Sequence, residues 1–384
     1  MNFGKQPAIL NMTFLVTILA VTPFGCGSPE QPEVQKKPDV ESVGEAKRVL
    51  VVANGKDVNS VRIANYYLQQ RKISRKQLVT LKTTSTDDIS PENYLIEIEE
   101  PIKAALAKNK DIDYIVLTKG VPLRLVDQGG YSVDATLAAM ELNFEPIGQT
   151  PGTFGITEKD QGAAIKRCKN PYFGSKEPFS HAKFGMYLVN RLTGYSVEDC
   201  FKLIDNSINS KPSKAPILID SQPKFVKGSA YWGMEVSMAR ASEYLKAKNL
   251  NVNFDRSEAF ANGDEALAGY CSWGSNDANF DLAAYHQLTF VPGAIAETFV
   301  STSGRTFEPT SGGQSLIADL IAQGVTGVKG YVSEPFTFAL CESGILFDRY
   351  TNGFNLAESF YAATPLVKWK DIVVGDPLCR PYKK

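Results

Sequence analysis

The sequence predicts an α/β protein built on an open, mainly parallel sheet with helices on both faces. Short uninterrupted apolar runs alternate along the chain with stretches in which apolar residues recur at helical spacing. An uninterrupted apolar run is typical of a strand buried on both faces, and its alternation with amphipathic helices indicates βαβ units. The 384 residues are 43% hydrophobic and 22% charged, a composition typical of a globular protein with a substantial core.

The first α/β stretch covers residues 47–190. Its apolar runs predict strands at 48–54, 77–83 and 113–120, and its helical spacing predicts helices at 57–71 and 93–109. Asp57 is placed to cap the first helix, and Pro101 predicts a kink or a restart in the second. Residues 121–183 are less regular and include a loop rich in Gly and Pro at 145–162. We expect a surface insertion here, with a lid as its candidate role.

The second α/β stretch covers residues 191–384 and continues the alternation. A strand predicted at 184–192 spans the boundary between the two stretches, and further strands are predicted at 215–220, 250–255, 265–273, 292–301 and 325–332. Helices are predicted at 196–210, 229–249 and 315–324, and in part of 342–364. Together with the first stretch this gives two successive α/β subdomains.

The N-terminus predicts export. Lys5 precedes an apolar run at 9–24 that is shorter than the ~20 residues a spanning helix needs, which favours a signal peptide over residues 1–26. Gly25 before Cys26 is similar to the lipobox of bacterial lipoproteins, in which the cysteine is acylated. We therefore expect Cys26 to anchor the protein in a membrane of the cell envelope, in the periplasm or at the outer membrane. A simple secretory signal or an uncleaved anchor is the alternative.

Composition supports the same interpretation further along the chain. Residues 27–46 are rich in Pro, Glu, Ser and Gln, which predicts a disordered tether.

Five more cysteines fit no zinc spacing, and we interpret most of them as small buried residues with their disulfide pairing left open: Cys168, Cys200, Cys271, Cys341 and Cys379. Lys and Arg total 41 against 42 Asp and Glu, so we expect no nucleic-acid partner.

Ligands of open α/β sheets bind beyond the carboxyl ends of the strands. That rule selects six candidate residues at predicted strand ends: Asn54, Lys119, Asp220, Trp273, Ser301 and Glu334. Trp273 offers a flat apolar face and one donor, its indole N–H, to a sugar or peptide, with Asn276 and Asp277 as polar neighbours. Arg305, in a loop rich in hydroxyl groups, is a candidate for a carboxylate or phosphate, or an exposed turn residue.

Two kinds of chemistry have candidates. Cys271 or Ser301 could act as a nucleophile with His286 as its base. We favour the alternative in which Cys271 lies in the core, Ser301 caps a turn and His286 lies on the surface. Asp277, Asn279 and Asp281 alternate like the start of a calcium loop, but Leu282 and Leu288 stand where an EF-hand needs Gly and Glu. A solvated turn rich in Asp and Asn is the favoured interpretation, so we expect no cofactor, and a looser calcium site is the alternative.

Several blocks of this chain resemble known proteins. The blocks "NSVRIANYYLQQRKIS", "VLTKGVPLRL", "VNRLTGYSVEDCFKLID", "GYCSWGSND" and "VVGDPLCRPY" are similar to a family of uncharacterised exported bacterial proteins found in genomes that encode exosortase. The resemblance covers most of residues 48–383. It implies no activity, because none is assigned to the family.

A more distant resemblance bears on mechanism. The order of "GYCSWGSND", "PGAIAETFVSTSGRTF", "SLIADLIAQGVTGVKGYV" and "DIVVGDPL" is similar to gingipain-type cysteine peptidases of the caspase-like fold. In those enzymes a His-Gly and a Cys end two successive strands, and here Trp273-Gly274 and Ser301 occupy those places. The resemblance implies a caspase-like C-terminal half that lacks the dyad and binds peptide or glycan. A hydrolase with Ser301 or Cys271 as a substituted nucleophile is the alternative.

Overall fold

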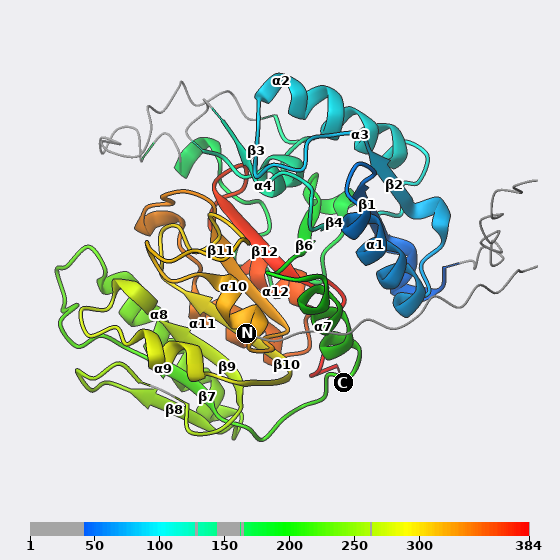
Figure 1. Cartoon of the computed structure of the whole chain (residues 1–384). Coiled ribbons are helices and arrows are strands. Elements are labelled where there is room, and N and C mark those ends of the chain that lie inside the picture. The colour runs from blue at the N-terminus through cyan, green and yellow to red at the C-terminus, as the bar shows by residue number, and fades with distance from the viewer. Residues whose placement is uncertain (1–41, 127–129, 144–161, 163–164, 262, 384) are drawn as a thin grey trace, which may run out of the picture. The chain divides into compact units, whose positions relative to one another are not determined.

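Ten strands form one sheet at the centre of the computed structural model, which describes residues 42–126, 130–143, 162, 165–261 and 263–383 (Figure 1). In spatial order the strands are β2 (Leu78–Leu81), β1 (Val49–Asn54), β4 (Tyr114–Thr118), β6 (Leu188–Leu192), β12 (Asp371–Gly375), β11 (Gly327–Tyr331), β10 (Phe290–Thr298), β9 (Leu267–Ser272), β7 (Ile217–Asp220) and β8 (Val252–Asp255). The prediction of an α/β fold with a mainly parallel sheet is confirmed.

The sheet consists of two blocks of strands that meet in its middle. The first block, β2-β1-β4-β6, is parallel throughout. The second block, β12-β11-β10-β9-β7-β8, is parallel except for the antiparallel pair β11–β12. The blocks are joined where Val374 of β12 pairs with Arg191 of β6. The two α/β stretches predicted from the sequence therefore contribute to one sheet.

Helices cover both faces of the sheet. On one side α7 (Val197–Ile208) contacts both α1 (Val58–Arg71) and α10 (Ile317–Ala322). On the other, α11 (Ser343–Thr351) contacts α8 (Trp232–Ala247) and α12 (Leu356–Ala362). Every residue of β1, β4, β6, β9, β11 and β12 is buried, as expected when both faces of a sheet are covered.

Local signals in the sequence explain where several helices begin and bend. The Asp57 carboxylate accepts hydrogen bonds from the backbone N–H groups of Asn59 and Ser60 and so caps α1 as predicted. Pro101 lies just after a π-helical turn, Leu95–Glu99, that links α2 (Pro91–Tyr94) to α3 (Glu100–Leu106). Because proline has no N–H to donate, the widened turn accommodates the break that Pro101 predicts.

The structure also departs from the sequence-based boundaries. Ser42 and Ala46 are buried and a 3-10 helix spans Gly44–Arg48, so the folded unit includes the end of the predicted tether. Within 121–183, α4 (Val133–Ala138) is buried at all of its residues and belongs to the core rather than to a surface loop. Residues 1–41, which include Cys26, and all of the predicted loop 145–162 except residue 162 lie outside the described residues.

The remaining elements are short. A second, two-stranded sheet pairs β3 (Asp88–Ile89) with β5 (Arg124–Leu125), and two short helices are α6 (His181–Phe184) and α9 (Leu282–Gln287). Of the helices in the described ranges, none has the length and apolar character required to cross a membrane.

Candidate functional site

A cleft of about 550 Å³ opens where β9, β10 and β11 end. Its apolar lining includes six aromatic residues: Phe225, Tyr231, Trp273, Phe299, Phe336 and Phe338. Its polar lining includes Lys224, Asn276, Ser301, Glu334 and Thr337. We call this the aromatic cleft. Four of the predicted site residues, Trp273, Asn276, Ser301 and Glu334, come together in it because successive strands of this block end at the same edge.

Trp273 forms the base of the aromatic cleft rather than a free platform. Only 1% of its surface is exposed, and its ring meets those of Phe225, Tyr231 and Phe299 edge-on or nearly so. Its indole N–H donates a 2.6 Å hydrogen bond to the Glu235 carboxylate on α8. The indole donor that the sequence analysis offered to a ligand is therefore used inside the fold.

The turn after β9 depends on the glycine that follows Trp273. Gly274 has a φ of +49°, in the left-handed region, and starts a 3-10 helix at Gly274–Asn276. A Cβ atom there would lie 2.8 Å from Cγ2 of Val300 and 3.0 Å from Oγ of Ser315. A side chain at this position would be strained and would collide with the segment after β10, which explains why a glycine follows Trp273.

The loop after β11 carries a strained aromatic residue into the cleft. Phe336 has φ 62° and ψ 157°, a conformation that only glycine adopts easily and that costs about 1–3 kcal/mol in other residues. The surrounding contacts fix it: its N–H donates to Glu334, and the indole of Trp369 donates to the Pro335 carbonyl. The Phe336 ring lies parallel to Phe338, with 5.9 Å between centroids. Strain maintained in this way is typical of binding sites.

A lysine lies behind this aromatic wall. Nζ of Lys370 is 5.6 Å from the centroid of Phe336 and 5.3 Å from that of Trp369. Burial lowers the pKa of Lys370 to about 8, although the Glu334 carboxylate acts in the opposite direction. The ammonium group is thus weakly solvated and attracted to the ring faces, which helps to hold Phe336 in place.

No histidine accompanies Ser301 in the described lining of the aromatic cleft. In the described part of the chain no side chain makes a hydrogen bond to Ser301 Oγ, and neither histidine lines the aromatic cleft. His286 lies on α9 with about half of its side chain exposed, and its Nε2 is 3.4 Å from Asp319. His181 pairs with Glu141 at 3.2 Å. The structure therefore does not bring Ser301 together with His286, the base that the hydrolase alternative considered.

Cys271 lies in the core of β9 and has no exposed surface. Burial, together with the nearby Glu297 carboxyl group, raises the pKa of the Cys271 thiol well above its ordinary value. A neutral, inaccessible thiol is inert, so the structure places Cys271 in the structural role that the sequence analysis favoured. All five cysteines in the described ranges are buried and free of disulfides.

Asp220 lies deep at the end of β7. It is 2% exposed, one of its oxygens accepts a hydrogen bond from Ser272, and the other has no partner among the described residues. Burial and the Asp277 carboxylate raise the pKa of Asp220 to about 7. Neither Asp220 nor Asp277 lines the aromatic cleft. Sequence reasoning placed them at the right edge of the sheet but could not show that they point inward.

The alternating acidic stretch after β9 folds as capped turns. Asp277 accepts hydrogen bonds from the side chain of Gln222 and the N–H of Asn279, while Asn279 donates to the Glu258 carbonyl. Asp281 caps α9. Across the residues that the structure describes, no group of three or more His, Cys, Asp or Glu side chains is arranged to bind a metal ion. The Asp277 and Asp281 oxygens accept hydrogen bonds from backbone and side-chain donors, as in the Asp- and Asn-rich turn that was the alternative to a calcium site.

Three predicted polar site residues make hydrogen bonds within the fold. Arg305 donates to the carbonyls of Thr302, Gln314 and Gly312, so its guanidinium holds the loop after β10 instead of facing outward for an anion. Asn276 donates to the Phe299 carbonyl and accepts from Gln314. At the other end of the sheet, the Asn54 side chain donates to the carbonyls of Thr84 and Gly120.

Sequence reasoning missed most of the aromatic lining. Phe225 and Tyr231 lie in the loop between β7 and α8, and Phe336 and Phe338 in the loop after β11. The segment "EPFTF" directly follows a predicted strand end, and this was the available signal. The loop between β7 and α8 carried none, because Tyr231 has the helical spacing of the buried face of α8 yet is 41% exposed at its start.

Comparisons with known proteins add little to this picture. No family model matches the chain, and no curated protein matches it. A solved structure described as that of a protease is similar over 89% of this chain and 80% of the other, with 11% sequence identity and a TM-score of 0.45. Likeness at this level does not extend to activity, so the side chains of the cleft decide its chemistry.

Proposed function

We propose that this is an exported cell-envelope protein that binds peptides in the aromatic cleft without cleaving them. The observation that carries the proposal is the convergence of six aromatic residues at the carboxyl ends of β9, β10 and β11. A concave, mainly apolar site with a few polar groups is the usual form of a ligand pocket. Strain at Phe336 supports the same site, because a fold maintains strain where the conformation serves a function.

The lining favours a peptide side chain over a glycan. A sugar ring presents many hydroxyl groups, and each loses water when it is bound. Within the described lining, the Trp273 indole and the Asn276 amide already have protein partners, which leaves few groups to replace that water. The accessible rings are largely phenyl groups without a polar atom. An aromatic or aliphatic side chain, with its backbone near Lys224 or Glu334, matches these walls better.

Binding without turnover follows from the groups at the two positions where peptidases of the resembling fold carry their dyad. An indole N–H can donate but cannot accept a proton at neutral pH, so Trp273 cannot act as a base. A serine without a base is a weak nucleophile. We infer that Ser301 contributes a hydroxyl group to the rim of the cleft and nothing to catalysis.

The location belongs to the same proposal. The apolar run before Gly25-Cys26 and the polar stretch after it support an acylated Cys26 that anchors the protein to the envelope. Metabolic labelling with a fatty acid should mark the wild-type protein and not a Cys26→Ser variant. Equal labelling of both proteins would overturn the lipid anchor, while the peptide site would be unaffected.

The binding site is tested by measuring how variants of its aromatic residues, and a matched tyrosine control, bind a peptide library. Tyr231→Ala and Phe338→Ala should each weaken peptide binding about tenfold, since each removes a large apolar contact. Tyr244→Ala is the control, because Tyr244 is an exposed tyrosine (46%) that lies outside the cleft on α8, the helix that Tyr231 precedes.

Three outcomes would count against the proposal. Equal binding by Tyr231→Ala and Tyr244→Ala would remove the cleft as the site. Selection of oligosaccharides instead of peptides, with the same dependence on Tyr231, would overturn the ligand class. Peptide cleavage that disappears in Ser301→Ala would favour the hydrolase alternative.

A further inference from the structure

A second hollow lies in the first block of strands, beside the amino ends of β1 and β2. It has a volume of about 830 Å³, and three lysines line it: Lys47, Lys76 and Lys108. All three are exposed, and none of their ammonium groups has a hydrogen-bond or ion-pair partner among the described residues. Asp111 is the acidic residue of the lining, so the hollow carries a net positive charge. We call it the lysine pocket.

The walls of the lysine pocket are fixed by buried polar groups. The Gln77 amide, 6% exposed, donates to the carbonyls of Ala46, Lys47 and Val49, which ties the helix bearing Lys47 to the one bearing Lys76. Ser42 donates to Gln77 and completes the frame. The backbone that carries Lys47 and Lys76 is therefore held in place by these hydrogen bonds, while their exposed side chains can change rotamer.

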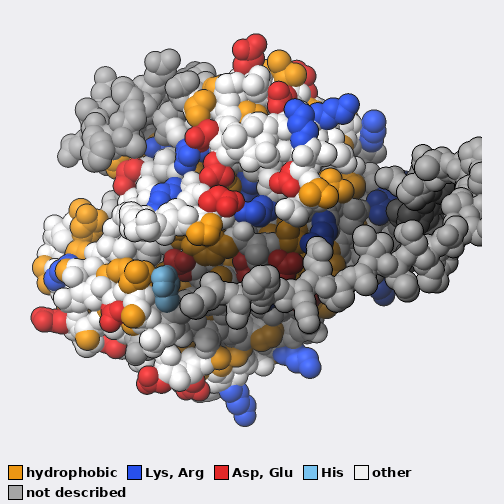
Figure 2. Space-filling model, viewed as in Figure 1, with side chains coloured by type: hydrophobic (Ala, Val, Ile, Leu, Met, Phe, Trp, Pro, Cys, Tyr) orange, Lys and Arg blue, Asp and Glu red, His pale blue; other side chains and the backbone are white. Residues whose placement is uncertain are grey.

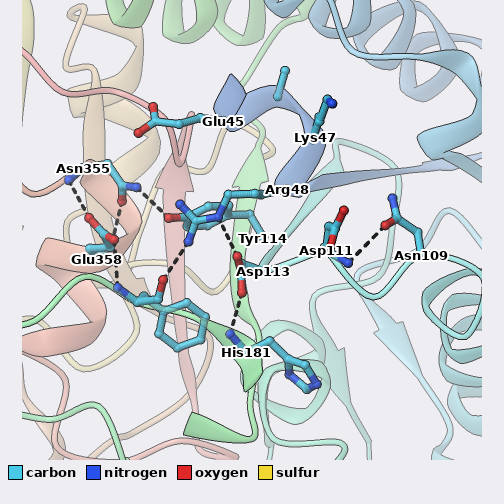
Figure 3. A network of polar contacts seen from close by, with 12 residues as sticks. Glu45, Lys47, Arg48, Asn109, Asp111, Asp113, Tyr114, His181, Asn355 and Glu358 are labelled. Atoms are coloured by element: carbon cyan, nitrogen blue, oxygen red, sulfur yellow. Dashed lines mark hydrogen bonds and ion pairs between the residues drawn. The ribbon is translucent and has the colours of Figure 1, made fainter. Parts of the chain in front are cut away.

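The residue after Lys47 anchors the same wall from behind. Arg48 donates to Asp113 at 2.6 Å and to the Phe179 carbonyl at 2.7 Å, and its guanidinium lies 5.0 Å from the centroid of Tyr114. Figure 3 shows Lys47 beside this anchored arginine, with Asn109 and Asp111 on the neighbouring loop. Asp113 is thus occupied by Arg48 and by the N–H of His181, so it does not neutralise the lysines.

Charge and shape together identify the ligand class. Lysines act as point charges that bind phosphate groups, and a hollow of this size admits a whole headgroup. In Figure 2 Lys and Arg side chains gather over α3, the helix that precedes Lys108. Ser42 also lies in the lining of the pocket.

We propose that the lysine pocket binds the phosphate-bearing headgroups of an anionic bilayer and so orients the folded unit on the membrane. This site is distinct from the aromatic cleft, and the proposal does not depend on peptide binding or on acylation of Cys26. A lysine near an anionic bilayer strengthens binding about fivefold, so the three should contribute about a hundredfold together.

The test uses residues 27–384, which contain the whole compact unit Asp39–Lys384 and have no acyl group. Binding is measured by co-sedimentation with vesicles of phosphatidylcholine, alone or mixed with phosphatidylglycerol. We expect binding to the mixed vesicles only, and weaker binding as salt is raised. The variant Lys47→Gln/Lys76→Gln/Lys108→Gln should lose about a hundredfold in affinity.

A matched triple variant separates the pocket from net charge. Lys202→Gln/Lys211→Gln/Lys214→Gln removes the same charge from exposed lysines outside the pocket and should bind like the unaltered protein. Equal losses in the two triple variants would overturn the proposal, as would equal binding to both kinds of vesicle. Tight binding of inorganic phosphate without vesicles would assign the pocket to a soluble anion instead and would overturn it as well.

Discussion

The carboxyl ends of the two strand blocks differ in how their side chains fill the space beyond the sheet. Beyond β9, β10 and β11 the aromatic cleft leaves about 550 Å³ open. Beyond β1, β4 and β6 the corresponding space is only about 80 Å³, and its lining includes five charged residues: Asp57, Asp87, Lys119, Arg191 and Glu308. The same arrangement of strand ends has thus produced an open site in one block and a closed one in the other.

The two sheet edges differ in the contacts that their side chains make, which are ion pairs in the first block and aromatic contacts in the second. Opposite charges that find partners draw loops together, as Arg191 does with Asp134 and with the carbonyls of Val121 and Pro122. Aromatic rings meet edge-on at centroid distances near 5 Å and cannot fill every gap. A sheet edge therefore becomes a binding site where its loops carry rings, and a structural joint where they carry ion pairs.

The closed block should be the more fragile to single substitutions. Arg191 and Asp134 are each 1% exposed, so Asp134→Ala leaves a buried guanidinium without its counter-ion. We expect the free energy of unfolding in urea to fall by about 3–5 kcal/mol. The double variant Asp134→Ala/Arg191→Met should recover part of this loss, because it removes the unpaired charge. A double variant less stable than the single one would show that the pair itself stabilises this block.

Glu297, on the strand β10 that ends at the aromatic cleft, should make the free energy of unfolding depend on pH. Glu297 of β10 has no exposed surface, and burial raises its pKa to about 8, although Lys329 and Tyr331 act in the opposite direction. Between the ordinary pKa of 4.5 and about 8, the folded state holds a proton that the unfolded state releases. Stability should therefore fall as pH rises through this window, by at most about 1.4 kcal/mol per pH unit from this group.

Glu297→Gln isolates this contribution. Glutamine cannot titrate, so the variant should show a flatter dependence of unfolding free energy on pH between about 5 and 8. Asp371, whose pKa burial also raises, contributes in the same direction and should remain visible in the variant. An unchanged slope in Glu297→Gln would mean that Glu297 is ionised in the fold and paired with Lys329.

The sequence predicted the fold better than the site, for a physical reason. Elements with strong local signals were found, such as α1 with its Asp57 cap and the buried run of β1. The strand β12 was missed because its apolar run is short and its place depends on pairing with β11, far away in the sequence. Strand ends also located Trp273 and Ser301 at the right edge.

The side chains of the site could not be foreseen in the same way. Their orientation depends on contacts between distant segments, such as the bond from the Trp369 indole to the Pro335 carbonyl. Trp273 was predicted to face a ligand with its N–H, but Glu235 on another element accepts that hydrogen bond. Patterns in a sequence specify which edge a residue reaches, whereas long-range packing decides where it points.

A smaller effect tests the strain in the cleft wall. At Phe336, Phe336→Gly should be more stable than Phe336→Ala by about 1–2 kcal/mol, because glycine adopts a φ of 62° without cost. At an ordinary exposed position alanine is the more stable of the two. Thermal unfolding of both variants measures the difference. Greater stability of the alanine variant would show that the backbone at 336 is unstrained in solution.

The smallest expected effect concerns the ion pair that links the two blocks. Lys119, after β4, lies 3.0 Å from Glu308, in the loop after β10, but 71% of the Glu308 side chain is exposed. Water and salt screen such a pair, so a double-mutant cycle with Lys119→Met and Glu308→Gln should give a coupling of about 0.2–1 kcal/mol that decreases at high salt. Peptide binding in the aromatic cleft should not change in either variant, since neither residue lines it. A coupling above about 2 kcal/mol would mean that the exposed pair, and not only the buried Arg191–Asp134 pair, holds the first block closed.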